Sequence, residues 1–204
     1  MIAAALLACA ANIAPVTLDA IVAVESRGEP LAILDNATGR SYHPRDQDEA
    51  IALARRLVAA GHRIDAGLMQ VDSVNWPALG LDASRIFEPC TNIRAGGEIL
   101  TADYAHAART YGEGQAALKH ALSAYNTGDF YRGFRNGYVA RYYGRAAVPA
   151  VSVHVHFAAL KRGRENRHQP DAGQARPNWT RAQLARLAAR STVYTKVAVN
   201  FPIR

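Results

Sequence analysis

The sequence has no long apolar run and no clear export signal. None of its 204 residues falls in an apolar stretch of about 18 or more, so no membrane-spanning helix is predicted. Residues 2–14 are apolar, but no Lys or Arg follows Met1, so the basic start of a secretory signal is missing. Residues 6–9 resemble a lipoprotein cleavage box that lies too near the start. We expect the segment to be the first part of the fold, the alternative being the remnant of a signal.

Cysteines and metal-binding motifs are also scarce. Cys9 and Cys90 are compatible with one disulfide in an oxidising compartment, or with two unrelated buried thiols. The seven histidines form no HExxH motif and no paired Cys/His spacing, so no metal site is expected. Residues 112–114 lack the preceding strand and the spacing of a phosphate-binding turn. We therefore expect neither a metal nor a cofactor.

Acidic residues are nearly absent from the last part of the chain. Residues 1–144 hold 13 Lys and Arg against 15 Asp and Glu, a net charge of −2. Residues 145–204 hold 11 against 2, a net charge of +9. We divide the chain into a body at 1–144 and a basic C-terminal extension at 145–204. A solvated tail is the favoured interpretation of the extension, with binding to an anionic surface as the alternative; nucleic acid is not the expected partner.

Apolar spacing predicts a mostly helical body. The first helix is expected to enter at Pro15, with Thr17 as its side-chain cap, and to end before Gly28. A loop or short hairpin and a short apolar piece are expected at 31–44 and 64–71. Further helices are expected at 46–60, with a cap at Asp46 or Asp48, and at 89–109, 115–126 and 138–142. In the extension we expect an extended segment at 148–157, a linker at 161–177 and a short basic helix at 180–190.

Glu25 occupies an unusual position on the first helix. Leu18, Ile21, Val22 and Glu25 share one face at helical spacing, so the carboxyl group ends an apolar stripe. Apolar surroundings penalise the charged form of a carboxyl group and raise its pKa, as a general acid requires. The alternative is a helix-end residue that pairs with Arg27 or another cation.

Three short motifs follow one another along the chain: Glu25–Ser26, Gly67–Gln70 (Gly-Leu-Met-Gln) and Ala124–Gly128 (Ala-Tyr-Asn-Thr-Gly). Together they resemble the soluble lytic transglycosylase (SLT) domain, which has a goose-type lysozyme-like fold. Residues 50–61 followed by 65–70 resemble its VirB1-like branch, which serves type IV secretion and conjugation systems. The resemblance covers roughly residues 12–143.

The resemblance implies a mainly α fold: a lysozyme-like α+β domain with a small β-hairpin region. It places Glu25 as the catalytic acid, the hydroxyl of Tyr138 on that carboxyl group, and Met69 against a sugar or its N-acetyl group. The residues it implies for substrate binding are Ser26, Met69, Gln70, Asn92, Tyr125, Asn126 and Tyr138. Turn or cap chemistry is the alternative for the Gln and Asn residues, and simple packing for the tyrosines.

The implied activity is cleavage of the peptidoglycan β-1,4 bond between N-acetylmuramic acid and N-acetylglucosamine with formation of a 1,6-anhydro ring. Ordinary glycosidases need a second carboxylate, but Asp35, Asp65 and Asp72 match no catalytic position of the family. A hydrolase and a non-catalytic wall-binding scaffold remain alternatives. Peptidoglycan glycan strands are the expected partner. Secretion-system components are a second expected partner, through the basic tail. The expected location is the periplasm or the exterior of the cell.

Overall fold

The computed structural model of the protein describes residues 4–143. The elements that we expected at 148–157, 161–177 and 180–190 lie outside the described residues. The division of the chain at residue 144 therefore stays a prediction.

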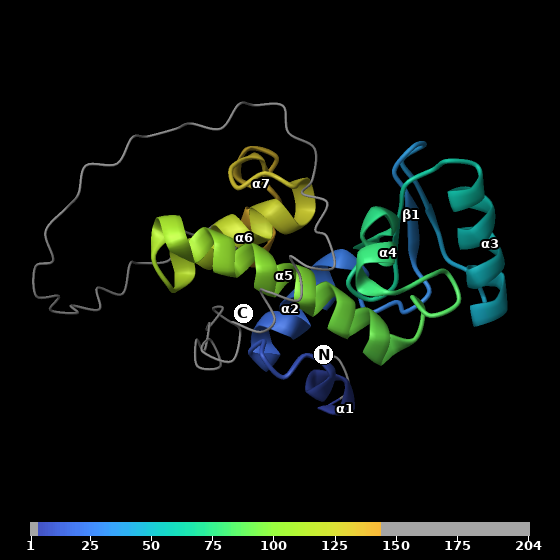
Figure 1. The fold of residues 1–204 in the computed structure, drawn as a ribbon, viewed down its shortest axis with the longest axis horizontal. Helices are drawn as coiled ribbons and strands as arrows, with labels where there is room; N and C mark the ends of the chain where they lie inside the picture. The colour runs from blue at the N-terminus through green and yellow to red at the C-terminus, as the bar shows by residue number, and fades with distance from the viewer. Residues whose placement is uncertain (1–3, 144–204) are drawn as a thin grey trace, which may run out of the picture.

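Helices make up most of the described chain, and a small sheet interrupts them after α2 (Figure 1). The helical elements are α1 (Ala4–Leu7), η1 (Ala8–Ala10), α2 (Pro15–Glu25), α3 (Gln47–Ala59), η2 (Ser73–Asn75), α4 (Trp76–Leu79), α5 (Pro89–Tyr111), α6 (Gln115–Thr127), α7 (Arg132–Arg135) and α8 (Tyr138–Tyr143). The strands are β1 (Ile33–Asp35), β2 (Arg40–Tyr42), β3 (Ile64–Ala66) and β4 (Val71–Asp72). The expected mainly α fold with a small β region is confirmed.

The four strands form one antiparallel sheet in the order β2-β1-β3-β4. The hairpin expected at 31–44 is its β1–β2 pair, with Ile33 opposite Tyr42. Asp35 stabilises the turn of this hairpin, because its carboxylate accepts hydrogen bonds from the Thr38 hydroxyl (2.7 Å) and the Ala37 N–H (3.0 Å). The apolar piece expected at 64–71 supplies β3, the start of β4 and the turn between them.

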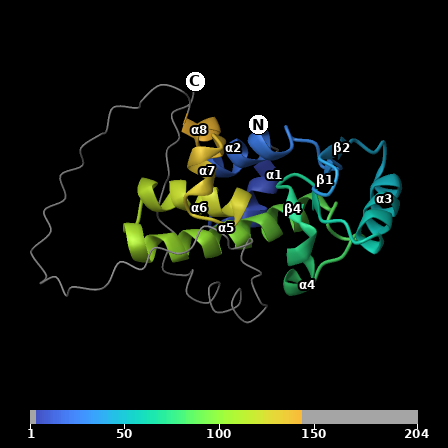
Figure 2. The same cartoon turned by 90° about the horizontal axis from the view of Figure 1, so that it is seen from above.

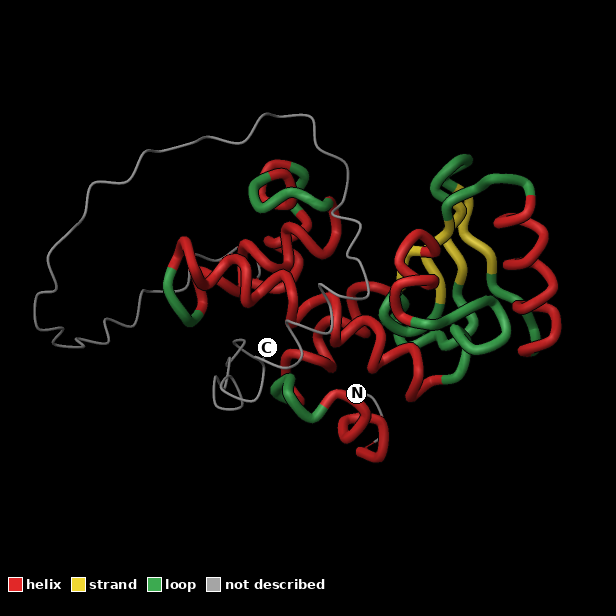
Figure 3. The backbone as a smooth tube through the Cα atoms, viewed as in Figure 1, coloured by secondary structure: helices red, strands yellow, loops and turns green. Residues whose placement is uncertain are grey.

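The sheet and α3 lie at one end of the molecule, and the α5–α6 pair extends toward the other (Figures 1 and 2). Figure 3 shows that the strands gather at that one end, with helices over the rest of the fold. One apolar face of α3 packs on β1 and β3. Its buried residues recur at helical spacing: Ala50, Leu53, Ala54 and Leu57. The chain passes from α2 to the first strand of the sheet shortly after Glu25, so Glu25 lies where the helical part of the fold meets the sheet.

The start of α2 differs from the expectation. Its N-cap is Ala14, which makes no side-chain cap bond, and Pro15 is the first helical residue. Proline has no N–H to satisfy and its fixed φ suits this position, so the helix begins there without a polar cap. Thr17 therefore lies inside the helix with its side chain buried, and the predicted cap at Thr17 is wrong. The cap of α3 is Asp46, one of the two expected residues, which accepts from the Glu49 N–H (2.8 Å).

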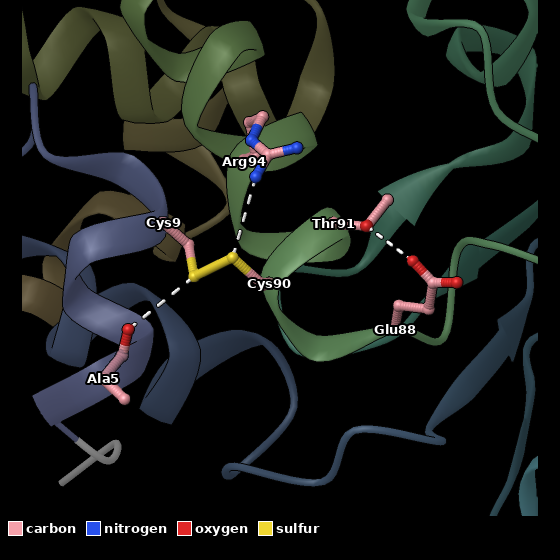
Figure 4. The surroundings of a disulfide bond; sticks show 6 residues. All are labelled: Ala5, Cys9, Glu88, Cys90, Thr91 and Arg94. Atoms are coloured by element: carbon pink, nitrogen blue, oxygen red, sulfur yellow. Dashed lines mark hydrogen bonds between the residues drawn. A yellow bond between two sulfur atoms is a disulfide. The ribbon is translucent and has the colours of Figure 1, made fainter.

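The N-terminal segment is part of the fold. Ala10 is buried, and it approaches α5 at Gly97, where an added Cβ would come within 3.1 Å of the Ala10 Cβ. Cys9 and Cys90 form a disulfide that joins this segment to the start of α5 (Figure 4). Of the two interpretations of the apolar start, the structure therefore supports the one that makes it the first part of the domain.

No single helix among residues 4–143 is long and apolar enough to cross a membrane. The bent pair Ala4–Ala10 and Pro15–Glu25 meets the length and composition test only when its two members are combined.

Candidate active site

Glu25 is the last residue of α2, and the three apolar residues of its stripe are in the core. Leu18 and Ile21 are 0% exposed and Val22 is 1% exposed. Glu25 itself is half-buried and lines a cavity of about 290 Å³. The cavity lies between the end of α2, the β1–β2 hairpin and the turn after β3. Its lining residues are Val24, Glu25, Ser26, Arg27, Glu29, Ala32, Ile33, Ser41, Tyr42, His43 and Gln70.

Two tyrosines of α8 surround the Glu25 carboxyl group. The Tyr138 hydroxyl donates to Glu25 Oε1, as the resemblance implies, and lies 2.6 Å from the Tyr142 hydroxyl. Burial raises the pKa of Tyr138 well above its ordinary value, and the negative charge of Glu25 raises it further. Burial and the same charge also raise the pKa of Tyr142. Both phenols therefore keep their protons at any physiological pH and are permanent hydrogen-bond donors.

The Gly-Leu-Met-Gln motif forms the tight turn between β3 and β4. Gly67 has a φ of 78° and Gln70 a φ of 46°, and the Gln70 N–H donates to the Gly67 carbonyl (3.1 Å). A side chain on Gly67 is excluded by space as well, because its Cβ would lie 2.2 Å from Asn92 Nδ2. The Gln70 Nε2 donates to the carbonyls of Ala32 (3.1 Å) and Gly67 (2.9 Å). These bonds use both amide hydrogens, so Oε1 is the atom through which Gln70 can accept a hydrogen bond in the cavity.

Three side chains hold this turn, one from α5, one from α6 and one from the residue that follows α2. Asn92 of α5 accepts from the Met69 N–H (2.8 Å) and donates to the carbonyls of Ala66 and Ile86 (2.9 Å each). The Tyr125 hydroxyl of α6 donates to the Met69 carbonyl (2.7 Å). At the end of α2, the Ser26 hydroxyl donates to the Leu68 carbonyl (2.8 Å). The turn is thereby fixed beside Glu25 from three directions.

Several of the residues expected to bind substrate make these contacts within the protein. Met69 is 0% exposed, Asn92 1% and Tyr125 9%, and the polar atoms of Asn92 and Tyr125 bond to the protein backbone. Met69 packs against Gly96 of α5 instead, where an added Cβ would lie 2.6 Å from the Met69 Cβ. The physical reason is that the tight turn needs buried partners for its backbone groups, and these residues provide them. They hold the turn, and their expected role in substrate binding stays a prediction.

The remaining expected residues are divided between the cavity and its surroundings. Ser26 and Gln70 line the cavity with Glu25. Asn126 is not among the lining residues; its Oδ1 accepts from Asn136 Nδ2 (3.3 Å), next to the start of α8. The structure thus brings Glu25, Ser26, Gln70 and Tyr138 together. Asn126 lies outside this group and connects α6 to the segment before α8.

The three aspartates considered as second carboxylates lie away from the cavity lining. Asp35 is in the hairpin turn, Asp72 pairs with Arg63, and Asp65 is buried in β3. In the described part of the chain, no group of three or more His, Cys, Asp or Glu side chains is placed to hold a metal ion.

The sequence analysis did not list Arg27, Glu29 and His43 as site residues, although it weighed Arg27 as a partner of Glu25. Arg27 and Glu29 lie two and four residues after Glu25, and that proximity was the available signal for them. His43 comes from the hairpin, and its Nδ1 lies 2.5 Å from Glu29 Oε2. Only the folding of the hairpin against the end of α2 brings this histidine to the site.

Replacement of Asn92 by alanine tests the support of the turn. It removes three buried hydrogen bonds and leaves the Met69 N–H and two carbonyls without a partner, so we expect the free energy of unfolding to fall by about 3 kcal/mol. Denaturant unfolding followed by circular dichroism measures this. Asn36→Ala is the matched control, because Asn36 is exposed and makes no side-chain hydrogen bond within residues 4–143. A loss below about 1 kcal/mol for Asn92→Ala would contradict the assignment.

Comparison with known families decides the identity of this domain. Residues 3–143 match the family described as "Transglycosylase SLT domain". The chain belongs to this SLT family. The family match covers every element described above and agrees with the resemblance that the three short motifs indicated.

The relatives of this SLT chain include VirB1 proteins, as expected. "Protein virB1" of Agrobacterium fabrum is 44% identical over 133 residues, which are 65% of this chain and 54% of that protein. "Type IV secretion system protein virB1" of Brucella abortus biovar 1 is 36% identical over 146 residues, 71% of this chain and 61% of that protein. The chain thus spans between 54% and 61% of the length of these two curated relatives. No solved structure matches it.

Proposed function

We propose that this SLT chain is a peptidoglycan lytic transglycosylase in which Glu25 is the single catalytic acid and base. The observation that supports this most is the position of Glu25. Its carboxyl group ends a buried apolar stripe, lines the cavity and accepts a hydrogen bond from Tyr138. An acid in such a place is partly shielded from water and held in one orientation, which are the two requirements for delivering a proton to a glycosidic oxygen.

In the first step, Glu25 donates its proton to the O4 oxygen of N-acetylglucosamine. The bond between that oxygen and C1 of N-acetylmuramic acid breaks, and positive charge develops at C1. The buried apolar stripe disfavours the carboxylate and so favours the protonated acid at the start of the reaction. Tyr138 opposes this by donating to the carboxyl group, and it stabilises the carboxylate that the first step produces.

In the second step, the C6 hydroxyl of the same muramic acid attacks C1. Its proton returns to Glu25, which restores the acid, and the new bond between O6 and C1 closes the 1,6-anhydro ring. The N-acetyl carbonyl of the substrate stabilises the charge at C1 in place of a second carboxylate. The positions of Asp35 and Asp72 support this scheme, because each is already engaged in the sheet region away from the cavity.

A lysozyme-like hydrolase is the second candidate, and Glu29 is the observation that favours it. Glu29 lines the same cavity as Glu25 and is a carboxylate that could activate water. Mass spectrometry of the muropeptides released from purified sacculi separates the two. We expect products that end in 1,6-anhydro-N-acetylmuramic acid; free reducing ends would favour the hydrolase, and no released product would favour a non-catalytic scaffold.

We further propose that the activity opens the cell wall locally for a type IV secretion or conjugation apparatus. The names of the relatives support this role. The proposed substrate supports a location in the periplasm or outside the cell. The extension of net charge +9 remains the proposed contact with secretion-system components or with acidic wall polymer.

Replacement of Tyr138 by phenylalanine tests the role of its hydroxyl. The variant keeps the aromatic ring but loses the bond to Glu25, so we expect kcat on purified sacculi to fall about tenfold with little change in KM. Tyr143→Phe is the matched control, because the Tyr143 hydroxyl bonds to Gln115 (2.8 Å) rather than to Glu25. Equal kcat values in the Tyr138 variant and the unmodified protein would remove Tyr138 from the mechanism.

A further inference from the structure

Arg27 is a cationic side chain of the cavity lining. It follows Ser26, the C-cap residue of α2, and it is exposed and lines the cavity. None of the salt bridges formed within residues 4–143 includes Arg27. Its φ of 57° is in the left-handed region, which helix ends usually fill with glycine. The chain thus holds a long charged side chain where the backbone favours the smallest residue.

His43 approaches the same cavity from the hairpin. Its Nδ1 is 2.5 Å from Glu29 Oε2, and this contact fixes the orientation of the ring. Nε2 is then the ring nitrogen that can bind a ligand in the cavity. The same contact directs the charge of Glu29 toward His43. Arg27 is the one Lys or Arg side chain among the residues that line the cavity, and no ion pair found within residues 4–143 includes it.

We infer that this cavity binds a carboxylate on the muramyl unit of the glycan, with Arg27 as its ligand. The inference rests on the proposed function. N-acetylmuramic acid differs from N-acetylglucosamine by a lactyl group, which ends in a free carboxylate or continues into a peptide stem that has carboxylates of its own. The planar guanidinium binds carboxylates through paired hydrogen bonds. Arg27 thereby selects muramic acid chains over uncharged chitin-like chains.

The test measures binding without turnover, in the full chain with Glu25→Gln. Isothermal titration calorimetry gives the Kd for three soluble oligosaccharides of equal length. The first is a muramic acid chain with peptide stems, the second is the same chain with its stems removed by an amidase, and the third is a chito-oligosaccharide. Adding Arg27→Gln is expected to weaken binding of at least one muramic acid chain about tenfold and to leave the chito-oligosaccharide unchanged.

The three probes also identify the source of the carboxylate. A loss on the chain with stems assigns a stem carboxylate, and a loss on the stripped chain assigns the lactyl carboxylate. Equal Kd values with and without Arg27 for both muramic acid chains would overturn the inference, as would an equal loss on all three probes or no binding to any of them. Arg56→Gln is the matched control, because it removes the same charge from the exposed side of α3.

Arg27→Gly separates binding from stability. Glycine suits the left-handed φ, so this variant is expected to keep or raise the midpoint of thermal unfolding while it weakens binding as Arg27→Gln does. A lower midpoint together with unchanged binding would show that Arg27 is merely structural. Product analysis of the unmutated protein reports on the proposed function by itself, so the failure of one proposal can be told from the failure of the other.

Discussion

Glu25→Gln is expected to lower the rate of peptidoglycan cleavage by about a thousandfold or more. Glutamine has the size of glutamic acid, and its carbonyl oxygen can still accept the hydrogen bond from Tyr138. It cannot release a proton to the leaving oxygen, nor take one from the C6 hydroxyl. Both steps of the proposed reaction therefore lose their acid or base in a variant whose packing is nearly unchanged.

The rate is measured as soluble fragments released from dye-labelled sacculi, with the thermal unfolding midpoint as the check on folding. Glu113→Gln is the matched control, because Glu113 lies exposed between α5 and α6. Glu29→Gln distinguishes the two mechanisms. A loss as large as that of Glu25→Gln would favour a two-carboxylate hydrolase, whereas the transglycosylase proposal expects a far smaller one. A Glu25→Gln protein as active as the unmodified one would refute the assignment of Glu25.

Loss of the disulfide is the change with the largest expected effect on stability. Cys9 and Cys90 are 81 residues apart, so their bridge restricts the unfolded chain strongly. The loop-closure relation gives a decrease in the free energy of unfolding of about 4.5 kcal/mol for the Cys9→Ser/Cys90→Ser double variant. Cys90 also lies two residues before Asn92, so the bridge anchors the part of α5 that supports the turn at Gly67.

Denaturant unfolding of the double variant and of the unmodified protein, each with and without a reducing agent, measures this effect. The reducing agent is expected to destabilise the unmodified protein and to leave the serine variant unchanged, which serves as the control. If the double variant unfolded at the same denaturant concentration as the oxidised protein, the disulfide would contribute nothing to the stability of the domain.

Local patterns predicted most of the helices and the position of Glu25. The apolar spacing of Leu18, Ile21 and Val22 alone places the carboxyl group at the end of a core-facing stripe. The polar turn residues between 31 and 44 indicated the hairpin. The cap at Thr17 failed because proline at position 15 begins the helix without a side-chain cap, and local sequence favoured both starts.

The roles of the motif residues could not be predicted from the sequence. Resemblance indicates which residue type a position holds, but not which of its atoms face the core. Met69 and Asn92 are expected to bind substrate because they belong to the motifs, and the structure shows that both side chains are buried. The contact of His43 with Glu29 depends on how the hairpin folds back on α2, which no local pattern contains.

The central claim is that the Glu25 carboxyl group acts first as the acid and then as the base. Water takes no part in forming the new bond to C1, which comes from the C6 hydroxyl of the substrate. Digestion of purified sacculi in water enriched in heavy oxygen, followed by mass spectrometry of the new muramic acid ends, tests it most directly. The account predicts no heavy oxygen in these ends, because the C6 hydroxyl of the substrate supplies the atom that bonds to C1. One heavy oxygen atom in each new end would show that water attacks C1, and it would contradict the account.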